Sequence, residues 1–418
     1  ITLDGLQQST YYSLYVEEEG GKKVGQLAFQ TPPYKNLKIL SLSCDRTYED
    51  HDSKTSYDVI GENENYQMMV HLGDQIYADW LYRNETMMSD DELKRAFRTV
   101  YRQTFGRVSA QRVLRKGSHI MLPDDHDIIN NVDRQMIQEN HPKKRFVHIG
   151  KTVFHEYQHQ LHTSNEEDPV FWIDEKEYME DACLFFLDTR YERAFHYDAN
   201  FPLWGSRQWK HILASMKRCG EATKVFYTSI PLLNMDEVMA KIVYVAEKER
   251  YGSHPDLYPD VDRFLQLVFE SNTTLDRTVV VSGDIHRYIE LSIKQLHTNK
   301  RLKQVASSGI SSHSTVSNEL KVWLFNALSG HFATNRVGNY EFSTIEDYLY
   351  KNYGVQQLSA GHLVVYGEKL PFDTTMQHAL QLLFDHFGIL KILLIILPIG
   401  ICCLPPCCCG LCLRKKKK

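Results

Sequence analysis

The stretch Met68-Met69-Val70-His71-Leu72-Gly73-Asp74-Gln75-Ile76-Tyr77 is a short apolar run that ends abruptly at a glycine and a carboxylate. An apolar run of this length that stops at a glycine is typical of a buried β-strand. In open α/β sheets, the residues that follow such strands form the crevice in which ligands bind. The stretch therefore predicts a strand that delivers Asp74 to a binding site.

Three further apolar runs end in the same way, each in a group of side chains that can bind a metal ion. They are 37–42 before Ser43-Cys44-Asp45, 119–122 before Asp124-Asp125-His126-Asp127, and 278–281 before Ser282-Gly283-Asp284-Ile285-His286. Four such strand ends in one chain are hard to ascribe to chance. We therefore expect the four groups to converge on one site.

Helical and strand patterns alternate between these runs. Further strands are expected over 182–187 and 224–229. Apolar residues at helical spacing predict helices over 91–105, 206–219, 261–270 and 317–328. This alternation predicts an α/β fold.

The four groups offer oxygen ligands together with imidazoles and one thiol, a set that suits Ca, Mn, Fe or Zn. Hydrolysis of a phosphate ester by paired metals needs a bridging carboxylate, ligands for each ion and an activated water. Asp74 is the natural bridge. The other ligands divide between the ions: Asp125 and Asn130 for one, and Cys44, Asp284 and His286 for the other.

The remaining polar residues of these groups have less defined roles. His126 is flanked by acids and suits a hydrogen bond to phosphate or protonation of the leaving oxygen. Asp124 and Asp127 are interpreted as residues that orient His126, and Asp45 as a cap or supporting carboxylate. Arg190 either clamps the substrate phosphate or forms a salt bridge, and the sequence leaves both open.

These segments resemble the PhoD-like alkaline phosphatases and phosphodiesterases of the metallophosphoesterase superfamily. The resemblance rests on Ser43-Cys44, Gly73-Asp74-Gln75-Ile76-Tyr77, Asp124-Asp125-His126-Asp127 with Asn130-Asn131, and Ser282-Gly283-Asp284-Ile285-His286, which occur in the family's order. Leu187-Asp188-Thr189-Arg190 and Ser307-Ser308-Gly309 also look like family segments. Asp79-Trp80-Leu81 and 84–91 look private to this chain, which bears on substrate choice.

The resemblance implies a sandwich of two β-sheets flanked by helices, and a centre of two or more metal ions. Asp125 and Asn130 would hold a divalent ion such as Ca. An Fe(III)-type ion would be held by Cys44, Asp74, Tyr77, Asp284 and His286. A phenolate and a thiolate on one ion favour Fe(III), with Zn or Mn as alternatives.

The resemblance and the sequence pattern together suggest four regions. Residues 1–34 are expected to be the end of a fibronectin-like β-sandwich, in which Tyr12, Leu14 and Val16 alternate. Residues 36–370 form the PhoD-like domain, 371–391 an amphipathic connector, and 392–418 a Cys-rich hydrophobic membrane segment with a basic tail. The chain begins at Ile1 rather than Met, so we expect a processed or truncated start.

The C-terminal region predicts attachment to a membrane. Residues 392–413 are uncharged and mostly apolar, and the run is long enough to cross a hydrocarbon core of about 30 Å as a helix. Because three prolines would kink such a helix, a segment that bends or inserts without crossing is the alternative. Arg414 and four lysines follow, so we expect a cytosolic tail and a lumenal or extracellular catalytic domain. The four lysines also resemble a retrieval signal of the early secretory pathway.

Six of the nine cysteines lie in this tail, where palmitoylation is a better interpretation than metal binding. Cys183 and Cys219 are expected to be buried thiols, with a disulfide between them as the alternative. Asn84-Glu85-Thr86 and Asn272-Thr273-Thr274 fit the glycosylation pattern and are compatible with a lumenal body.

His155-Glu156-Tyr157-Gln158-His159 matches the His-Glu-x-x-His pattern of zinc proteases. A third ligand at the expected spacing is missing, and 19 histidines make an accidental match easy. We interpret this segment as a solvated helix face, with a zinc protease as a distant alternative.

The sequence thus predicts a membrane-attached hydrolase of phosphate esters, either a phosphatase or a phosphodiesterase. In the mechanism that the motifs imply, a metal-bound hydroxide attacks phosphorus while His126 assists the departing oxygen. The substrate would be a small molecule, or a lipid or glycan phosphodiester near the membrane. Nucleic acid is not expected as a partner, because the net charge of −5 includes the five cationic residues 414–418 and the rest of the chain therefore carries −10. A catalytically silent binding module with the same fold is the alternative.

Overall fold

A computed structural model of the chain describes residues 5–46, 55–161, 169–270, 272–311, 335–348 and 351–370. The helix expected over 317–328, the connector 371–391 and the apolar segment that begins at residue 392 lie outside these residues. Within the described ranges, none of the helices combines the length and apolar character needed to cross a membrane.

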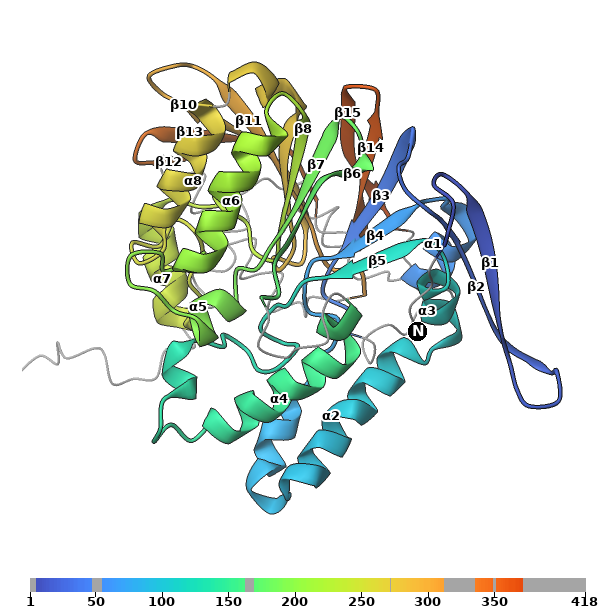
Figure 1. The fold of residues 1–418 in the computed structure, drawn as a ribbon. Helices are drawn as coiled ribbons and strands as arrows, with labels where there is room; N and C mark the ends of the chain where they lie inside the picture. The colour runs from blue at the N-terminus through green and yellow to red at the C-terminus, as the bar shows by residue number, and fades with distance from the viewer. Residues whose placement is uncertain are drawn as a thin grey trace, which may run out of the picture. The chain divides into compact units, whose positions relative to one another are not determined.

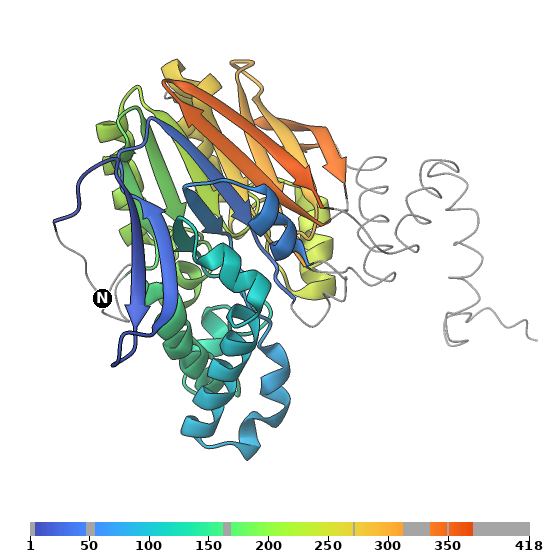
Figure 2. The ribbon, with the colours of Figure 1, turned by 90° about the vertical axis from the view of Figure 1, so that its right-hand side faces the viewer.

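Two β-sheets form the centre of the fold, as the sequence predicts (Figure 1). The larger sheet has the spatial order β12 (Arg336–Val337), β13 (Tyr340–Tyr348), β10 (Tyr288–Gln295), β11 (Arg301–Ser307), β9 (Thr278–Ser282), β8 (Thr223–Thr228), β7 (Ala182–Leu187) and β6 (Trp172–Met179). The smaller sheet has the order β15 (His362–Lys369), β14 (Asn352–Ser359), β3 (Asn36–Leu42), β4 (Met68–His71) and β5 (Ser118–Met121). Figure 2 shows β14 and β15 beside β3, although they come from opposite ends of the chain.

Side chains that alternate along the strands fill both faces of the larger sheet. Val279 and Val281 of β9 pack with Ile39 and Val70 of the smaller sheet in the core between the sheets. Val280 points the other way, into the core beneath the helices. Because both faces are covered, the strands are apolar at nearly every position, which is why they are recognisable in the sequence.

The helices cover the outer faces of the two sheets (Figure 1). Over the larger sheet lie α6 (Gly205–Cys219) and α8 (Tyr258–Glu270), with α7 (Glu237–Glu247) on the same side, and over the smaller sheet lie α1 (Ser56–Asn63) and α3 (Val108–Leu114). The helices α2 (Asp90–Phe105) and α4 (Lys144–Tyr157) pack on each other around a separate core. The short helix α5 (Tyr191–Phe195) buries Tyr191 and Ala194 in the core that α2 and α4 share. Short 3₁₀ segments are η2 (Asp79–Met87), η3 (Arg134–Ile137), η4 (His159–Leu161) and η5 (Asn272–Arg277).

The start of α2 shows how local chemistry sets an element boundary. The hydroxyl of Ser89 accepts a hydrogen bond from the backbone N–H of Glu92, and the Glu92 carboxylate accepts one from the backbone N–H of Ser89 at 2.8 Å. This capping box satisfies two backbone donors that a helix otherwise leaves unpaired. The capping box therefore sets the N-cap of α2 at Ser89, two residues after η2 ends at Met87.

The strand directions decide where the site lies. In the smaller sheet β3, β4 and β5 are parallel, and in the larger sheet β7, β8, β9 and β11 are parallel. The carboxyl ends of parallel neighbours lie at the same edge of a sheet. All four sequence groups follow strands of these two sets, so the fold has the arrangement that convergence requires.

The first residues form a β-hairpin of β1 (Tyr11–Glu17) and β2 (Lys23–Gln30), which pair with each other in a two-stranded sheet. Ala28 of β2 bridges to Lys116 of the main body. Tyr11 and Val16 of the hairpin are exposed. The expected alternation holds for Tyr12 and Leu14, which are half-buried, and fails at Val16. Membership in a fibronectin-like sandwich stays a prediction.

Cys183 of β7 and Cys219 of α6 form a disulfide, so the expectation of two buried thiols is wrong and the alternative is correct. Both side chains are fully buried in the core between the larger sheet and its helices. The sequence could not decide this, because spacing alone does not say that the last turn of one helix packs over the start of a strand.

We expect that removing this disulfide by the double substitution Cys183→Ala and Cys219→Ala will lower the free energy of unfolding by about 3–4 kcal/mol, because the bond restricts the unfolded chain between its two ends. Denaturant unfolding followed by circular dichroism measures the difference. Wild-type protein treated with reductant is the matched control and should show the same loss. An unchanged midpoint in both samples would contradict the expectation.

Candidate metal centre

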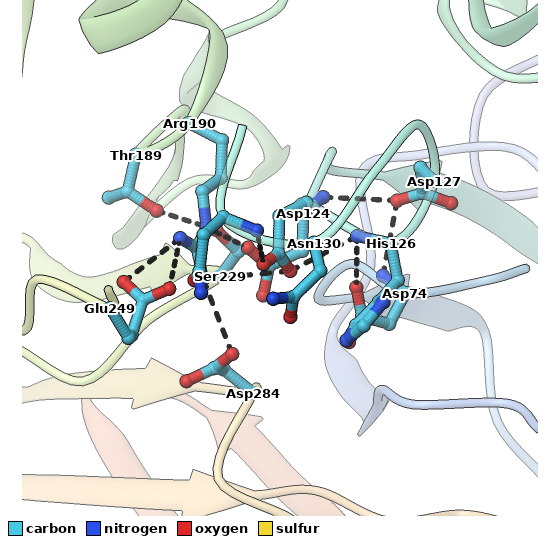
Figure 3. A network of polar contacts seen from close by, with 12 residues as sticks. Asp74, Asp124, His126, Asp127, Asn130, Thr189, Arg190, Ser229, Glu249 and Asp284 are labelled. Atoms are coloured by element: carbon cyan, nitrogen blue, oxygen red, sulfur yellow. Dashed lines mark hydrogen bonds and ion pairs between the residues drawn. The ribbon is translucent and has the colours of Figure 1, made fainter. Parts of the chain in front are cut away.

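The four sequence groups meet at one edge of the sandwich, as predicted. Cys44 follows β3, Asp74 follows β4, Asp125 follows β5 and His286 follows β9. Figure 3 shows Asp74, Asp124, His126 and Asp284 from three of these loops in one network of polar contacts. Residues far apart in the sequence therefore come together because they follow the carboxyl ends of parallel strands in the two sheets.

Close backbone approach makes this convergence possible at two glycines. A Cβ atom at Gly73 would lie 2.3 Å from the Cβ of Asp124, and one at Gly283 would lie 2.7 Å from Oγ of Ser43. Both contacts are shorter than any side chain tolerates. Glycine at position 73 lets two loops of the smaller sheet touch, and glycine at position 283 lets a loop of the larger sheet touch a loop of the smaller sheet.

Four of the predicted ligands have left-handed backbone conformations. The φ angles are 63° at Cys44, 56° at Asp74, 70° at Asp284 and 52° at His286. Residues other than glycine rarely adopt such angles, because Cβ crowds the backbone, and they cluster at functional sites where surrounding structure enforces them. Each of these residues sits where its strand turns sharply, and the turn aims its side chain at the common site.

Asp74 is the centre of the ligand arrangement. Three groups of side chains have ligand atoms within 4.8 Å of one another, and Asp74 belongs to all three. The groups are Cys44, Asp74 and His286; Asp74, Asp125 and His126; and Asp74, Asp124, Asp125 and Asp284. One carboxylate shared by neighbouring ligand groups is what a bridge between two ions requires.

Tyr77 lies beside the first of these groups. Its hydroxyl lies 3.1 Å from Oδ2 of Asp74 and 2.9 Å from Nε2 of His286. Burial raises the pKa of this hydroxyl well above its usual value, and the carboxylate of Asp74 raises it further. A phenol in this setting ionises only when a cation replaces its proton, so the position suits a ligand of a strongly charged ion.

Among the described residues, Cys44 is the one free cysteine, and it lies at the site. Its Sγ lies 3.1 Å from Oγ of Ser308 and 3.5 Å from Oδ2 of Asp74, and the side chain is fully buried. Burial raises the pKa of the thiol to about 11, against hydrogen bonds from Ser308 and Ser43 that lower it. Metal binding requires the thiolate and would release this proton.

The carboxylates carry more negative charge than the protein's own cations balance. Burial raises the pKa values of Asp74 and Asp124 well above their usual range. It raises the pKa of Asp284 to about 7, although Arg190 opposes the rise. Among the described residues, Oδ2 of Asp124 and Oδ2 of Asp284 are buried without a hydrogen-bond partner. Buried acids with unpaired oxygens suit bound cations, and the site therefore fits the metal ions that its donor set suggests.

Arg190 provides the main internal counter-charge. Its guanidinium is fully buried and pairs with Asp124, with Glu249 at 2.9 Å and with Asp284 at 3.3 Å (Figure 3). These contacts agree with the salt-bridge role of Arg190, one of the two roles that the sequence left open. A direct contact between Arg190 and a substrate stays a prediction.

Asp127 does not orient His126, which corrects that interpretation. It accepts hydrogen bonds from the backbone N–H groups of Asp74 at 3.1 Å, Gln75 at 3.1 Å and Asp124 at 3.0 Å. The loops after β4 and β5 are therefore tied together by one carboxylate. Asp124 likewise does not bind His126 but contributes to the acidic ligand group beside Arg190.

Asp79 is the residue that orients His126, and sequence reasoning missed it. Its Oδ2 lies 2.7 Å from Nδ1 of His126, and its Oδ1 accepts a hydrogen bond from the backbone N–H of Asn130. The segment was interpreted as private to this chain and relevant only to substrate choice. The one sequence signal for a role of Asp79 at the site is its position five residues after Asp74. Glu249, the partner of Arg190, lies in a charged run without any pattern.

Asn130 is exposed, and Figure 3 draws it within the same network. The neighbouring Asn131 donates its backbone N–H to Oδ2 of Asp125 at 2.5 Å. The Asn-Asn pair therefore does lie beside the acidic group. A metal bond from the side chain of Asn130 stays a prediction.

In the His-Glu-x-x-His segment, the Nδ1 atoms of His155 and His159 lie 3.4 Å apart, but among the described residues no third potential ligand joins them in a metal-binding group. The helix α4 ends at Tyr157, so His155 and His159 are not on one helix. Glu156 pairs with Arg98 through two hydrogen bonds of 2.7 Å. His159 is buried, so the segment is also not simply a solvated face. Its glutamate is held in an ion pair and is not available as a general base.

Comparisons with known proteins agree with this geometry. A model of the PhoD-like phosphatase family matches residues 39–348, which include all the strand ends that form the site. Among solved structures, the chain is similar to one titled "Structure of PhoD", with a TM-score of 0.61 and 15% identity, over 88% of this chain and 78% of that chain. This likeness shows a shared fold. A comparison with curated protein sequences gives no match.

We expect Asp79→Asn to lower the pKa of His126. Burial acts to lower this pKa, but the carboxylates of Asp125, Asp74 and Asp79 outweigh burial and raise it to about 10. Removing one of the three negative charges must shift it downward. An NMR titration of the metal-free protein with labelled histidine measures the shift. Asp91→Asn, an equal charge change at an exposed position of α2, is the control and should leave His126 unchanged. Equal titration curves for Asp79→Asn and wild type would contradict the assignment.

Proposed function

The chain belongs to the PhoD-like phosphatase family, and from this membership and the site geometry we propose that it is a metal-dependent phosphatase or phosphodiesterase that acts at the site centred on Asp74. The observation that carries the proposal is the presence of Asp74 in all three groups of potential ligands. A single ion would not need a shared carboxylate, whereas phosphate-ester hydrolysis by two ions does.

The chain's residues divide into two ligand sets around Asp74. Asp125, with Asn130 beside it, would hold one divalent ion. The other set would consist of Cys44, Tyr77, Asp284 and His286, whose thiol and phenol favour Fe(III), with Zn or Mn as alternatives. Cys44 and His286 lie in one ligand group with Asp74, whereas Asp284 lies in the group that contains Asp124 and Asp125. When bound, such ions lower the pKa of water and neutralise charge that develops on the phosphate.

His126 is placed to supply a proton. In the metal-free site, burial acts to lower the pKa of His126, but Asp125, Asp74 and Asp79 outweigh burial and raise it to about 10, and Asp79 lies 2.7 Å from Nδ1. The second ring nitrogen, Nε2, is then the proton donor that a leaving oxygen needs. Asp79 thereby favours the protonated form of the His126 ring and fixes its orientation. A carboxylate has the same role beside a catalytic histidine in hydrolases.

We expect the full-length protein, loaded with metal, to hydrolyse nitrophenyl phosphate, bis-nitrophenyl phosphate or both. Asp74→Asn should abolish turnover and lower the metal content measured by elemental analysis, because both ligand sets lose their common member. Glu156→Gln is the matched control and should retain turnover, since Glu156 binds only Arg98 among the contacts above. Peptide cleavage that is lost in Glu156→Gln would instead indicate a protease. If the wild-type protein binds no metal and hydrolyses neither substrate, that result would indicate a binding module.

We propose further that the catalytic domain lies in a lumenal or extracellular space, attached to a membrane through residues 392–413, so that a lipid or glycan phosphodiester is within reach. The Cys183–Cys219 disulfide supports an oxidising compartment. The exposed position of Asn84 in η2 supports access by the glycosylation machinery.

If this location is right, protein expressed in a eukaryotic secretory system should carry a glycan on Asn84. Asn84→Gln should then migrate faster on a gel, and treatment with an endoglycosidase should remove the difference from wild type. Thr86→Ala, which leaves the asparagine intact but destroys the pattern, is the matched control and should behave like Asn84→Gln. Protein found in the cytosol with reduced Cys183 and Cys219 would argue against the location.

A further inference from the structure

Ser308 lies at a fifth strand end that reaches the metal centre. It directly follows β11, which is parallel to β9, so it arrives at the same edge of the larger sheet as Asp284 and His286. The ligand sets described above leave the segment Ser307-Ser308-Gly309 without a role. The side chain of Ser308 is fully buried, so neighbouring protein groups alone decide which hydrogen bonds its hydroxyl makes.

Backbone hydrogen bonds fix the segment that carries Ser308 against the end of β3. The carbonyl oxygen of Ser43 accepts hydrogen bonds from the backbone N–H groups of Gly309 at 3.3 Å and of Ile310 at 3.0 Å. Gly309 has a φ angle of 87°, in the left-handed region that glycine adopts without strain. The loop after β11 is therefore held beside the loop after β3.

The hydroxyl of Ser308 contacts two of the predicted ligands. Its Oγ lies 3.1 Å from Sγ of Cys44 and accepts a hydrogen bond of 3.0 Å from the backbone N–H of His286. A hydroxyl has one proton and two acceptor lone pairs. Because the bond from His286 uses a lone pair, the proton of Ser308 remains available, and Sγ of Cys44 lies within its reach.

The protonation state of Cys44 decides the direction of the contact with Ser308. A thiol can donate, and Oδ2 of Asp74 lies 3.5 Å from Sγ as an acceptor. A thiolate, the form that binds a metal ion, has no proton and can only accept. With Cys44 in that form, Ser308 must donate to the sulfur. The hydroxyl of Ser43, 3.3 Å from Sγ, is a second donor.

Hydrogen bonds to this sulfur matter because Cys44 is fully buried. A buried anion is costly unless nearby groups pair with it. Donors to a ligating sulfur also draw electron density away from it, and so they tune the metal that it binds. Ser308 thus stabilises the thiolate on one side and holds the loop of His286 on the other.

We propose that Ser308 is a positioning residue of the metal centre. Its hydroxyl donates to the Cys44 thiolate and accepts from the backbone of His286, so that one side chain links two ligands from different loops, and Ser43 donates a second hydrogen bond to the same sulfur. The inference rests on the metal site of the proposed function and deepens it, because it assigns the groups that prepare the sulfur ligand.

The test is binding of Co(II) to the full-length protein after removal of its own metals. Cobalt bound to a thiolate gives a charge-transfer band in the near ultraviolet. Loss of a hydrogen bond to the sulfur lowers the energy of this band, because the sulfur then gives up electron density more readily. We expect Ser308→Ala to shift the band to longer wavelength. It should also weaken cobalt binding about 10–100-fold, the usual effect of losing a residue that supports a ligand.

Two further variants separate the hydrogen bond to the sulfur from general support of the loop. Ser43→Ala removes one donor and leaves the bond between Ser308 and His286 in place, so it should shift the band in the same direction. Its effect should be smaller, since its contact with the sulfur is longer. Ser311→Ala is the matched control, because Ser311 is a buried serine on the same loop whose hydroxyl donates to Oδ1 of Asp45 at 2.7 Å. It should keep the wild-type band and affinity.

An unshifted band in cobalt-loaded Ser308→Ala or Ser43→Ala would overturn the proposal, even if affinity falls, because it would show that the serine only supports its loop. A wild-type protein that binds cobalt without a thiolate band would overturn it as well. Turnover separates these results from failure of the proposed function. If the bands shift but wild type hydrolyses no ester, the hydrolase proposal fails and this one stands. If wild type hydrolyses esters and the bands do not shift, the reverse holds.

Discussion

The burial of several carboxylates around Asp74 is the constraint on which the site depends. Taking charged groups out of water is costly unless they are paired or bind metals. The protein places Asp74, Asp124, Asp125 and Asp284 close together and supplies one fully buried arginine in their midst. The fold must therefore be stable enough to hold these acids before any cation arrives. Two sheets with a shared apolar core, and helices on both outer faces, provide that stability.

The acids also have unequal environments. Asp125 receives the charge of Arg190 and His126 and the backbone N–H of Asn131, which outweigh its burial and lower its pKa to about 2. Asp284 is near the same arginine, yet burial and the neighbouring Glu249 and Asp125 raise its pKa to about 7. One acid is thus ready to bind a cation at any ordinary pH, whereas the other gains its charge together with the ion. The two acids therefore differ in pKa although they belong to the same group of potential ligands.

Most of the fold and the ligand cluster could be predicted because each rests on a local pattern. Strands covered on both faces are continuous apolar runs, so their ends were placed to within about a residue, as for β4 and β9. The functional groups directly follow these ends. Asp79 and Glu249 were missed because their partners, His126 and Arg190, come from other loops, and no sequence pattern encodes a contact across loops. The Cys183–Cys219 bond was left open for the same reason.

Substrate preference and chemistry belong to different parts of this arrangement. The ligands that would hold metals are fixed by parallel strand ends, by glycines that permit no side chain, and by Asp127, which ties two loops together. Asp79 and Arg46 do not belong to the predicted ligand sets. Asp79 contacts His126, and Arg46 stacks on the ring of Tyr77. The segment η2, which begins at Asp79, also carries the exposed Trp80. A change in η2 can therefore alter both the proton donor and the surface that a substrate meets, while the ligand set stays intact.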